Sequence, residues 1–409
     1  MVAPAPAKRF ALESTSGVSR LMKNYALRAR KAREEQGAKI CWHWAVSPPE
    51  ILRAFNIYPF MVELHSGFLS AKGEITKYLE LAEGWGFSRD ACTLHRACLG
   101  HSLAGEEAML PNPDLLVCTT SCDSTAKALF PIADHFGVPY FILDLPWNVQ
   151  ASEGPQVQDY RVRYYKGQLE DLIAFLEKQT GQSLDEVRLR DSFRQADRLY
   201  SAWRDICQLK ANVPCPMGGK DEVVATGVLM QLAGDPEGAD FMERLRDEVA
   251  QRVAHGQGVI EDEQHRILWL GPYIAYDLAL FDHFEELGAV VVKAELDHML
   301  SGLYGGKLDP GNPLESFARK QIANLYNGLL ENRIEITRRM VGDLKVDGIV
   351  YMCAFFCHLL GGSQRAIKDA MSQEFGVPTL VVDVDNVDPR SYNPDIVRSR
   401  IEDFLEMLG

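Results

Sequence analysis

The 409-residue chain lacks three features, and each absence excludes a class of protein. It has no surplus of basic residues, because 43 Lys and Arg stand against 57 Asp and Glu for a net charge of −14. Such an acidic surface repels nucleic acid and anionic membranes, so we expect neither as a partner. No uninterrupted apolar run approaches the roughly 20 residues of a membrane span. The opening MVAPAPAKRFALESTSG has no apolar core of a secretory signal, so we expect a cytoplasmic protein.

The glycine-rich loops that bind nucleotides are also missing from the sequence. GLYGGKL (302–308) comes near to one, but the Gly-x4-Gly-Lys-[Ser/Thr] spacing fails at Ser301 and Leu308. No Gly-x-Gly-x-x-Gly follows a predicted strand. We therefore expect neither ATP hydrolysis nor NAD binding by these devices.

Cysteine is present in an unusual arrangement. The nine cysteines are an odd number, and a disulfide framework is not expected in a reducing compartment. Six of them form three close pairs, which are Cys92/Cys98, Cys118/Cys122 and Cys353/Cys357. The scattered cysteines Cys41, Cys207 and Cys215 are interpreted as small buried side chains.

Two segments of the chain repeat one pattern of strand, Cys-x3-Cys, helix, FGVP turn and second strand. PDLLVCTTSC and HFGVPYFILDLPWN in the first half match VDGIVYMCAFFC and EFGVPTLVVDVDNVD in the second half. In each FGVP turn, Gly137 or Gly376 suits a helix C-cap, and the following proline stops the helix. We predict an α/β fold with two doubly wound parallel-sheet domains related by this internal repeat.

The predicted organisation has four parts. They are an N-terminal helical segment (1–38), a first α/β domain (39–155), a helical connection (156–260) and a second α/β domain (261–409). Strands are predicted over 39–46, 58–64, 113–120, 139–145, 265–271, 289–296, 348–355 and 379–384. One long helix is predicted over roughly 314–342.

Both Cys-x3-Cys segments lie at the end of a predicted strand. Sites in open parallel sheets form beyond the carboxyl ends of the strands, so the two segments should converge in one cleft if the two domains face each other. Thiolates are ligands of soft metal centres, and cysteines at i and i+4 suit neighbouring irons of an iron–sulfur cubane. The same spacing suits a single zinc ion less well, because zinc-binding pairs favour small loops.

Basic residues lie between and just after the first cysteine pair, in the segment CTLHRACLGHSLAGEE. The candidate catalytic residues are His95, Arg96 and His101. Basic side chains near a cluster can offset thiolate charge or donate protons to a substrate. The alternative interpretation is a helix start with solvated basic side chains. Tyr273, in the turn GPYIAYD, is the next candidate proton donor.

These motifs resemble the 2-hydroxyacyl-CoA dehydratase and benzoyl-CoA reductase superfamily. The resemblance runs from about Lys39 to the end of the chain, through KICWHWAVSPPEILRAFNIYPF, CTLHRACLG, LLVCTTSCDSTAK and FGVPTLVVDVD. It implies a cytosolic protein of anaerobes, with two α/β domains and an iron–sulfur cluster in the cleft between them. It also implies a separate homodimeric iron–sulfur ATPase, the activator, as the electron donor.

The number of cysteines departs from the dehydratase pattern, in which three cysteines of a subunit hold one cubane. Six paired cysteines are similar to the double-cubane cluster protein branch of the superfamily. This resemblance implies a homodimer that reduces a small molecule with ATP-driven electrons at an [8Fe-9S] cluster. The implied ligands are Cys92, Cys98, Cys118, Cys122, Cys353 and Cys357, three for each cubane, without deciding which three.

Two other functions stay open at this point. The first is a dehydratase or benzoyl-CoA reductase-type subunit with one [4Fe-4S] cluster, in which the extra thiols are structural. Such a subunit needs a second, different subunit and a CoA site, and the sequence shows no clear basic patch for the CoA phosphates. The second is a non-enzymatic metal-binding protein, for instance one that binds zinc.

Overall fold

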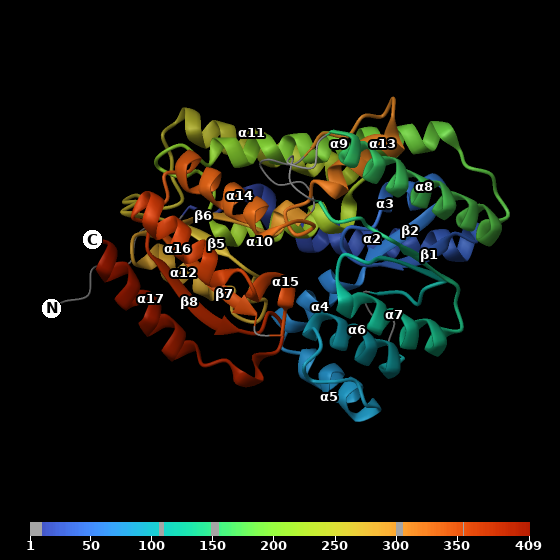
Figure 1. Cartoon of the computed structure of the whole chain (residues 1–409), viewed down its shortest axis with the longest axis horizontal. Helices are drawn as coiled ribbons and strands as arrows, with labels where there is room; N and C mark the ends of the chain where they lie inside the picture. The colour runs from blue at the N-terminus through green and yellow to red at the C-terminus, as the bar shows by residue number, and fades with distance from the viewer. Residues whose placement is uncertain (1–9, 106–109, 149–154, 300–305, 355) are drawn as a thin grey trace.

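The computed structural model describes residues 10–105, 110–148, 155–299, 306–354 and 356–409. Residues 302–305 of the glycine-rich stretch GLYGGKL therefore lie outside the described residues. The described chain forms two parallel four-stranded sheets surrounded by helices (Figure 1). Among these helices, none combines the length and the apolarity that a membrane crossing requires.

The first sheet has the strand order β2-β1-β3-β4, and all of its strands are parallel. Its strands are β1 (Lys39–His43), β2 (Ile57–Met61), β3 (Leu115–Thr119) and β4 (Tyr140–Leu143). The helices between them are α3 (Pro49–Ala54), α4 (Val62–Ala71), α5 (Ile75–Trp85), α6 (Thr93–Ala104) and α7 (Asp123–Phe136). We call this sheet and these helices the first lobe.

The second sheet repeats the same order as β6-β5-β7-β8, again with parallel strands. Its strands are β5 (His265–Leu270), β6 (Ala289–Ala294), β7 (Gly348–Ala354) and β8 (Thr379–Val384). With them lie α12 (Ala279–Glu286), η2 (Leu296–Met299), α14 (Leu330–Asp343), α15 (His358–Gly361), α16 (Gln364–Phe375), η3 (Pro389–Ser391) and α17 (Pro394–Leu408). We call this unit the second lobe.

The identical strand order confirms the predicted α/β fold with two parallel sheets related by a repeat. The central strands β3 and β7 are buried at every position, as expected for apolar strands of a parallel sheet that helices cover on both faces. The FGVP turns also behave as predicted. Gly137 and Gly376 end α7 and α16 in the left-handed conformation, with φ of +63° and +68°.

The remaining helices come from the N-terminus, from the segment between β4 and β5, and from the segment between β6 and β7. They are α1 (Glu13–Ser16), α2 (Val18–Gln36), α8 (Pro155–Thr180), α9 (Glu186–Leu209), α10 (Gly219–Leu232), α11 (Pro236–Ala254) and α13 (Pro313–Ile322). We call α8–α11 and α13 the helical layer. Its helices α9 and α11 run side by side along the top of Figure 1. The helical layer and α2 share one hydrophobic core with the first sheet.

The prediction of one long helix over 314–342 is wrong. Helix α13 ends at Ile322 and α14 begins at Leu330, and the loop ANLYNGL (323–329) separates them. Asn and Gly are weak helix formers. The side chain of Asn324 also accepts a hydrogen bond of 2.9 Å from the backbone N–H of Tyr326, which competes with helical hydrogen bonding.

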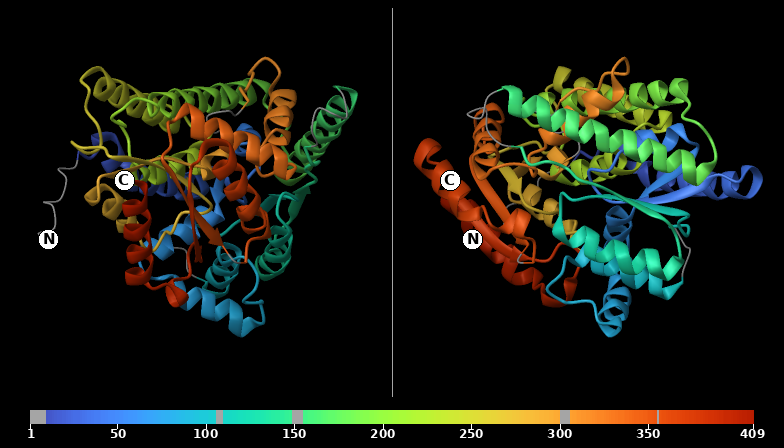
Figure 2. Two further views of the ribbon diagram at one scale, coloured as in Figure 1. Left: turned by 60° about the vertical axis from the view of Figure 1, so that its left-hand side comes forward. Right: turned by 45° about the vertical axis from the view of Figure 1, so that its right-hand side comes forward.

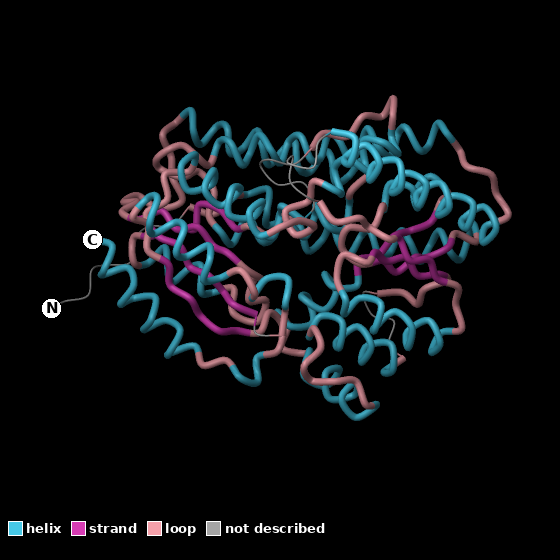
Figure 3. Tube along the Cα trace, viewed as in Figure 1, coloured by secondary structure: helices cyan, strands magenta, loops and turns pink. Residues whose placement is uncertain are grey.

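The strands form two separate groups in the side views and in the tube (Figures 2 and 3). The second lobe has its own core clusters, distinct from the core that the first lobe shares with the helical layer. The carboxyl ends of the strands therefore bring two sets of loops toward the space between the lobes, where a site is expected. The predicted boundaries at 38/39, 155/156 and 260/261 stay predictions.

Candidate functional site

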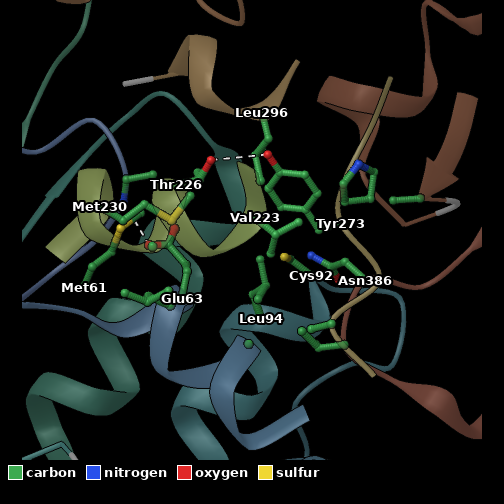
Figure 4. A pocket seen from close by; sticks show the side chains of 18 of the residues that line it. Met61, Glu63, Cys92, Leu94, Val223, Thr226, Met230, Tyr273, Leu296 and Asn386 are labelled. Carbon is green, nitrogen blue, oxygen red and sulfur yellow. Dashed lines mark hydrogen bonds between the residues drawn. The ribbon is translucent and has the colours of Figure 1, made fainter. Parts of the chain in front are cut away.

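A cavity of about 420 Å³ lies where the two lobes and the helical layer meet. Its wall combines α4 and the starts of α6 and α7 with α10, the 323–329 loop, and the loops around α15 and after β8. Most lining side chains are aliphatic or aromatic, and none of the described ones is Lys or Arg. Figure 4 shows Cys92, Glu63, Tyr273 and Asn386 around part of this space. We call it the interlobe cavity.

Each cysteine pair contributes one half-buried thiol to the interlobe cavity. These lining thiols are Cys92, Cys122 and Cys357. Burial raises the pKa of the Cys92 thiol well above its usual value, and the neighbouring Cys122 and Cys357 raise it further. The structure therefore brings together one cysteine from each of the three pairs, from both lobes.

The three lining thiols share one backbone setting, since each precedes the first turn of a helix. Cys92 precedes α6, Cys122 precedes α7 and Cys357 precedes α15. Burial is the largest influence and raises the pKa of each thiol, to about 11 for Cys357, while backbone N–H groups of the following turn act in the opposite direction. Because N–H groups at a helix start favour a negative charge, these positions suit thiolate ligands.

The other cysteine of each pair is buried. These thiols belong to Cys98, Cys118 and Cys353. The sulfur of Cys98 lies 3.3 Å from the hydroxyl of Ser66. Burial raises the pKa of Cys118 to about 12, with smaller contributions from Glu63 and Cys122. The structure thus separates each pair into a cavity-lining thiol and a buried thiol.

Glu63 and His95 form a hydrogen-bonded pair in the cavity wall. His95 Nε2 lies 3.3 Å from Glu63 Oε1, and Glu63 Oε2 accepts a hydrogen bond of 2.9 Å from the backbone N–H of Ala45. Within the described residues, the buried Nδ1 of His95 has no hydrogen-bond partner. The carboxylate therefore fixes the imidazole ring and leaves one ring nitrogen for proton transfer. The sequence analysis missed Glu63, although its place just after strand β2 was a usable signal.

Arg96, the second candidate, does not line the cavity. Its guanidinium lies 3.2 Å from Asp388, which follows β8, and 3.6 Å from Glu83 on α5. It also donates a hydrogen bond of 2.8 Å to the carbonyl of Arg89. Arg96 therefore ties α6 to the second lobe.

His101, the third candidate, packs inside the first lobe. Its ring centroid lies 4.5 Å from that of His65, 5.3 Å from that of Tyr78 and 6.4 Å from that of Trp42. The neighbouring Gly100 allows this close packing of α6, because a Cβ there would meet the carbonyl oxygen of Tyr78 at 1.8 Å. Of the three predicted catalytic residues, the structure places His95 alone at the cavity.

Tyr273 and helix α10 form another part of the wall. The Tyr273 hydroxyl lies 3.3 Å from Thr226 Oγ1, and burial raises the pKa of this phenol well above its usual value (Figure 4). Val223, Thr226 and Met230 project from α10 into the same region. The sequence analysis did not single out α10, because its residues lack the polar pattern of the helices around it.

A buried positive charge lies beside α15. Arg333 of α14 pairs with Glu295, and it donates a hydrogen bond of 3.0 Å to the carbonyl of Leu360 in α15. Its charge lowers the pKa of Cys357, against the larger effect of burial. The sequence analysis missed Arg333, because a basic residue in a polar helix is usually solvated.

A mononuclear metal site needs several ligand atoms around one point. In the part of the chain that the structure describes, no group of three or more His, Cys, Asp or Glu side chains is spaced to hold one metal ion. Cysteines that bind a cubane attach to different irons, so they need not meet at one point. The lining thiols at three helix starts therefore fit a cluster better than a zinc ion.

Known proteins are similar to this chain over most of its length. The profile of the 2-hydroxyglutaryl-CoA dehydratase D-component family matches residues 44–408. The (R)-2-hydroxyisocaproyl-CoA dehydratase alpha subunit of Clostridioides difficile is 26% identical over 400 residues, covering 95% of this chain and 94% of the relative. The (R)-phenyllactyl-CoA dehydratase alpha subunit of Clostridium sporogenes is 25% identical over 386 residues, covering 92% and 91%. A benzoyl-CoA reductase subunit of Thauera aromatica is 25% identical over 346 residues, covering 80% and 78%.

Proposed function

Because the chain belongs to the 2-hydroxyglutaryl-CoA dehydratase D-component family, we propose that it is an iron–sulfur enzyme that reduces a small molecule in the interlobe cavity. The observation that carries this proposal is the meeting of three cysteines, one from each pair, at three helix starts. The proposed cluster ligands include Cys92, Cys122 and Cys357, whether the cluster is one cubane or two. The buried thiols Cys98, Cys118 and Cys353 extend the centre to a double-cubane [8Fe-9S] cluster with three thiolates for each cubane.

When bound, such a cluster supplies single electrons at low potential. The described lining of the cavity is mostly apolar, which excludes water from the substrate. His95 keeps its Nε2 proton on Glu63 and gives or takes a proton at Nδ1, the nitrogen without a protein partner among the described residues. Arg333 holds a positive charge beside Cys357 and offsets the charge of a bound thiolate.

Electrons come from a separate partner in this proposal. The sequence has no phosphate-binding loop, so ATP hydrolysis is assigned to a homodimeric iron–sulfur ATPase that acts as the activator. The proposed working unit is a homodimer of this chain. The relatives are themselves named as subunits, which supports the need for further components.

One specific observation favours a second candidate function, a 2-hydroxyacyl-CoA dehydratase or benzoyl-CoA reductase-type subunit with one [4Fe-4S] cluster. Only three of the six paired thiols line the cavity in the described structure, and dehydratase subunits among the relatives carry that activity in their names. In this case the buried thiols are structural, and the enzyme is a lyase that needs a second subunit.

The experiment that separates the two candidates measures iron and acid-labile sulfide per chain after oxygen-free purification. The double-cubane proposal expects about eight irons per chain, and the dehydratase candidate expects about four. A fully active protein with about four irons would refute the double cubane.

Cysteine variants sharpen this measurement. Replacing Cys92, Cys122 or Cys357 by Ser should lower the iron content under both candidates. Replacing Cys98, Cys118 or Cys353 by Ser should lower it only if the buried thiols are ligands too. Comparing the two positions of each pair therefore shows whether the buried thiol is a ligand.

A further inference from the structure

The interlobe cavity has a buried hydroxyl in its wall that makes no hydrogen bond within the described residues. Tyr326, in the 323–329 loop, lines the cavity with a side chain that is 7% exposed. Its Oη has no hydrogen-bond partner among the described residues. Tyr326 clusters with Leu325 and Leu360, and Cys357 packs against this cluster. Tyr326 therefore belongs to the part of the cavity wall that lies beside a lining thiol.

The loop that carries Tyr326 is firmly held at its backbone. Asn324 accepts the hydrogen bond of the Tyr326 N–H at 2.9 Å. The side chain of Asn327 donates to the carbonyls of Pro146, at 2.8 Å, and of Ile322, at 3.3 Å. The backbone N–H of Asn148 donates to the Asn327 carbonyl at 2.7 Å. The loop backbone that carries Tyr326 is thus held by α13 and by the segment after β4.

A second tyrosine provides a direct comparison. The Arg333 guanidinium lies 5.6 Å from the ring centroid of Tyr326 and 5.4 Å from that of Tyr351. The Tyr351 hydroxyl donates to the carbonyl of Leu360 and lies 3.2 Å from Ser363 Oγ. The two phenols share one cation, but only the Tyr351 hydroxyl has protein partners among the described residues.

An unpaired buried hydroxyl is costly, because it has lost its hydrogen bonds to water without gaining a protein partner. Fixed polar groups in an otherwise apolar cavity are typical of ligand-binding sites. A phenol carries its proton at neutral pH, so the Tyr326 hydroxyl acts as a hydrogen-bond donor. The described lining contains no Lys or Arg to bind an anion. A neutral acceptor is therefore the ligand that this wall suits.

We propose that the Tyr326 hydroxyl anchors the substrate by donating a hydrogen bond to an oxygen or nitrogen atom of a small, neutral, mainly apolar molecule beside Cys357. This inference deepens the proposed function, since the molecule bound there is the one to be reduced. Binding itself needs no electron transfer, so it can be tested separately from reduction.

The test uses two probes of one shape, which are cyclopentanone with an acceptor oxygen and cyclopentane without one. Their affinities are measured by ligand-observed NMR on the oxygen-free holoprotein, for the wild type and for Tyr326→Phe. The variant should bind cyclopentanone about 10-fold more weakly and bind cyclopentane as the wild type does. The carbonyl stretch of bound cyclopentanone should shift to the frequency of a carbonyl without a hydrogen bond.

Tyr351→Phe is the matched control. It should keep the affinity for cyclopentanone and lower the unfolding temperature by a few degrees, because it removes a hydroxyl with protein partners. Tyr326→Phe should leave the unfolding temperature unchanged or raise it. Equal cyclopentanone affinity in wild type and Tyr326→Phe would overturn the inference, as would failure of the wild type to bind either probe. Loss of reduction activity in all assays, with these affinities as expected, would instead reject the proposed function alone.

Discussion

At the scale of single residues, the two histidines of α6 differ in their surroundings. His95 has one ring nitrogen on Glu63 and the other without a partner in the described structure. His101 lies among the rings of His65, Tyr78 and Trp42, outside the cavity lining. A helix can thus present one histidine to a cavity and bury another six residues later. The two side chains should respond differently to the same substitution.

His95→Gln should lower turnover about 10²-fold or more, because Gln keeps a polar contact with Glu63 but cannot transfer a proton. The iron content should stay at the wild-type value, since His95 is not a proposed ligand. Turnover and iron per chain are measured on the same preparation. His101→Gln serves as the control, with wild-type turnover of the folded enzyme and a lower unfolding temperature from lost ring packing. Wild-type turnover in His95→Gln would exclude His95 as the proton carrier.

Two further histidines make the stability of the protein depend on pH. Burial lowers the pKa of His43 to about 4 and that of His65 to about 3, from the ordinary value of 6.5. Below pH 6.5 the unfolded chain binds protons that the folded chain does not. The free energy of unfolding should therefore fall as the pH drops from about 6.5 to 4, by up to about 1.4 kcal/mol per pH unit for each histidine.

This pH dependence is measured by urea unfolding between pH 7.5 and pH 4.5. His65→Phe should reduce the slope of the unfolding free energy against pH, because the titrating group is gone while a ring remains. The slope above pH 7 should be the same in both proteins. An unchanged slope below pH 6.5 would show that His65 is not held neutral in the fold.

At the scale of secondary-structure elements, the loop after β8 is fastened to the first lobe beside the cavity. The Thr93 hydroxyl donates a hydrogen bond of 2.8 Å to Asp385, and the Ser70 hydroxyl donates one of 2.7 Å to the carbonyl of Val387. Arg96 adds its ion pair with Asp388. Since Thr93 directly follows Cys92, these contacts fix the start of α6 against the second lobe.

Arg96→Met should destabilise the protein by about 2 kcal/mol, because it removes a buried guanidinium that bonds the Arg89 carbonyl and pairs with Asp388, although Asp388 keeps Arg390. The matched control is Arg198→Met. Arg198 also pairs with two carboxylates, at 2.8 Å on Asp240 and 2.6 Å on Glu243, but its side chain is 34% exposed. This control should lose less than about 1 kcal/mol. Chemical denaturation of both variants measures the difference, and equal losses would contradict a special role for the contact between the lobes.

At the scale of the whole molecule, two lobes with the same strand order enclose one cavity, and each lobe supplies part of its wall. Neither lobe alone contains all three lining thiols, because Cys92 and Cys122 belong to the first lobe and Cys357 to the second. The site therefore depends on how the lobes are held together, and the contacts around Arg96 and Asn327 serve this purpose.

The proposed assembly gives a prediction at this scale. Light scattering should show a particle of twice the 45.8 kDa of the chain, and the purified chain should not hydrolyse ATP without a partner ATPase. Substrate reduction should appear only when that ATPase and ATP are both added. ATP-driven reduction by the purified chain alone would contradict the partner requirement.

Much of the fold was determined by the sequence itself. The predictions included the eight strands, the helix ends at Gly137 and Gly376, and the repeat with its two Cys-x3-Cys segments. The family match confirms the predicted superfamily. These features depend on neighbours in the chain, because strand periodicity and helix capping act over a few residues. The long helix over 314–342 failed as a prediction because the Asn324 side chain competed with helical hydrogen bonding.

Only the tertiary structure decided which thiol of each pair lines the cavity and which residues surround it. Glu63 meets His95 across 32 positions of the chain, and Arg333 reaches Glu295 across 38. Tyr326 lies in a loop that a first-lobe residue, Asn148, helps to hold. Such pairings depend on where distant segments come together in space, and no local pattern of residues encodes that. The sequence could predict the types of chemistry, but the packing of the lobes selected the side chains that perform it.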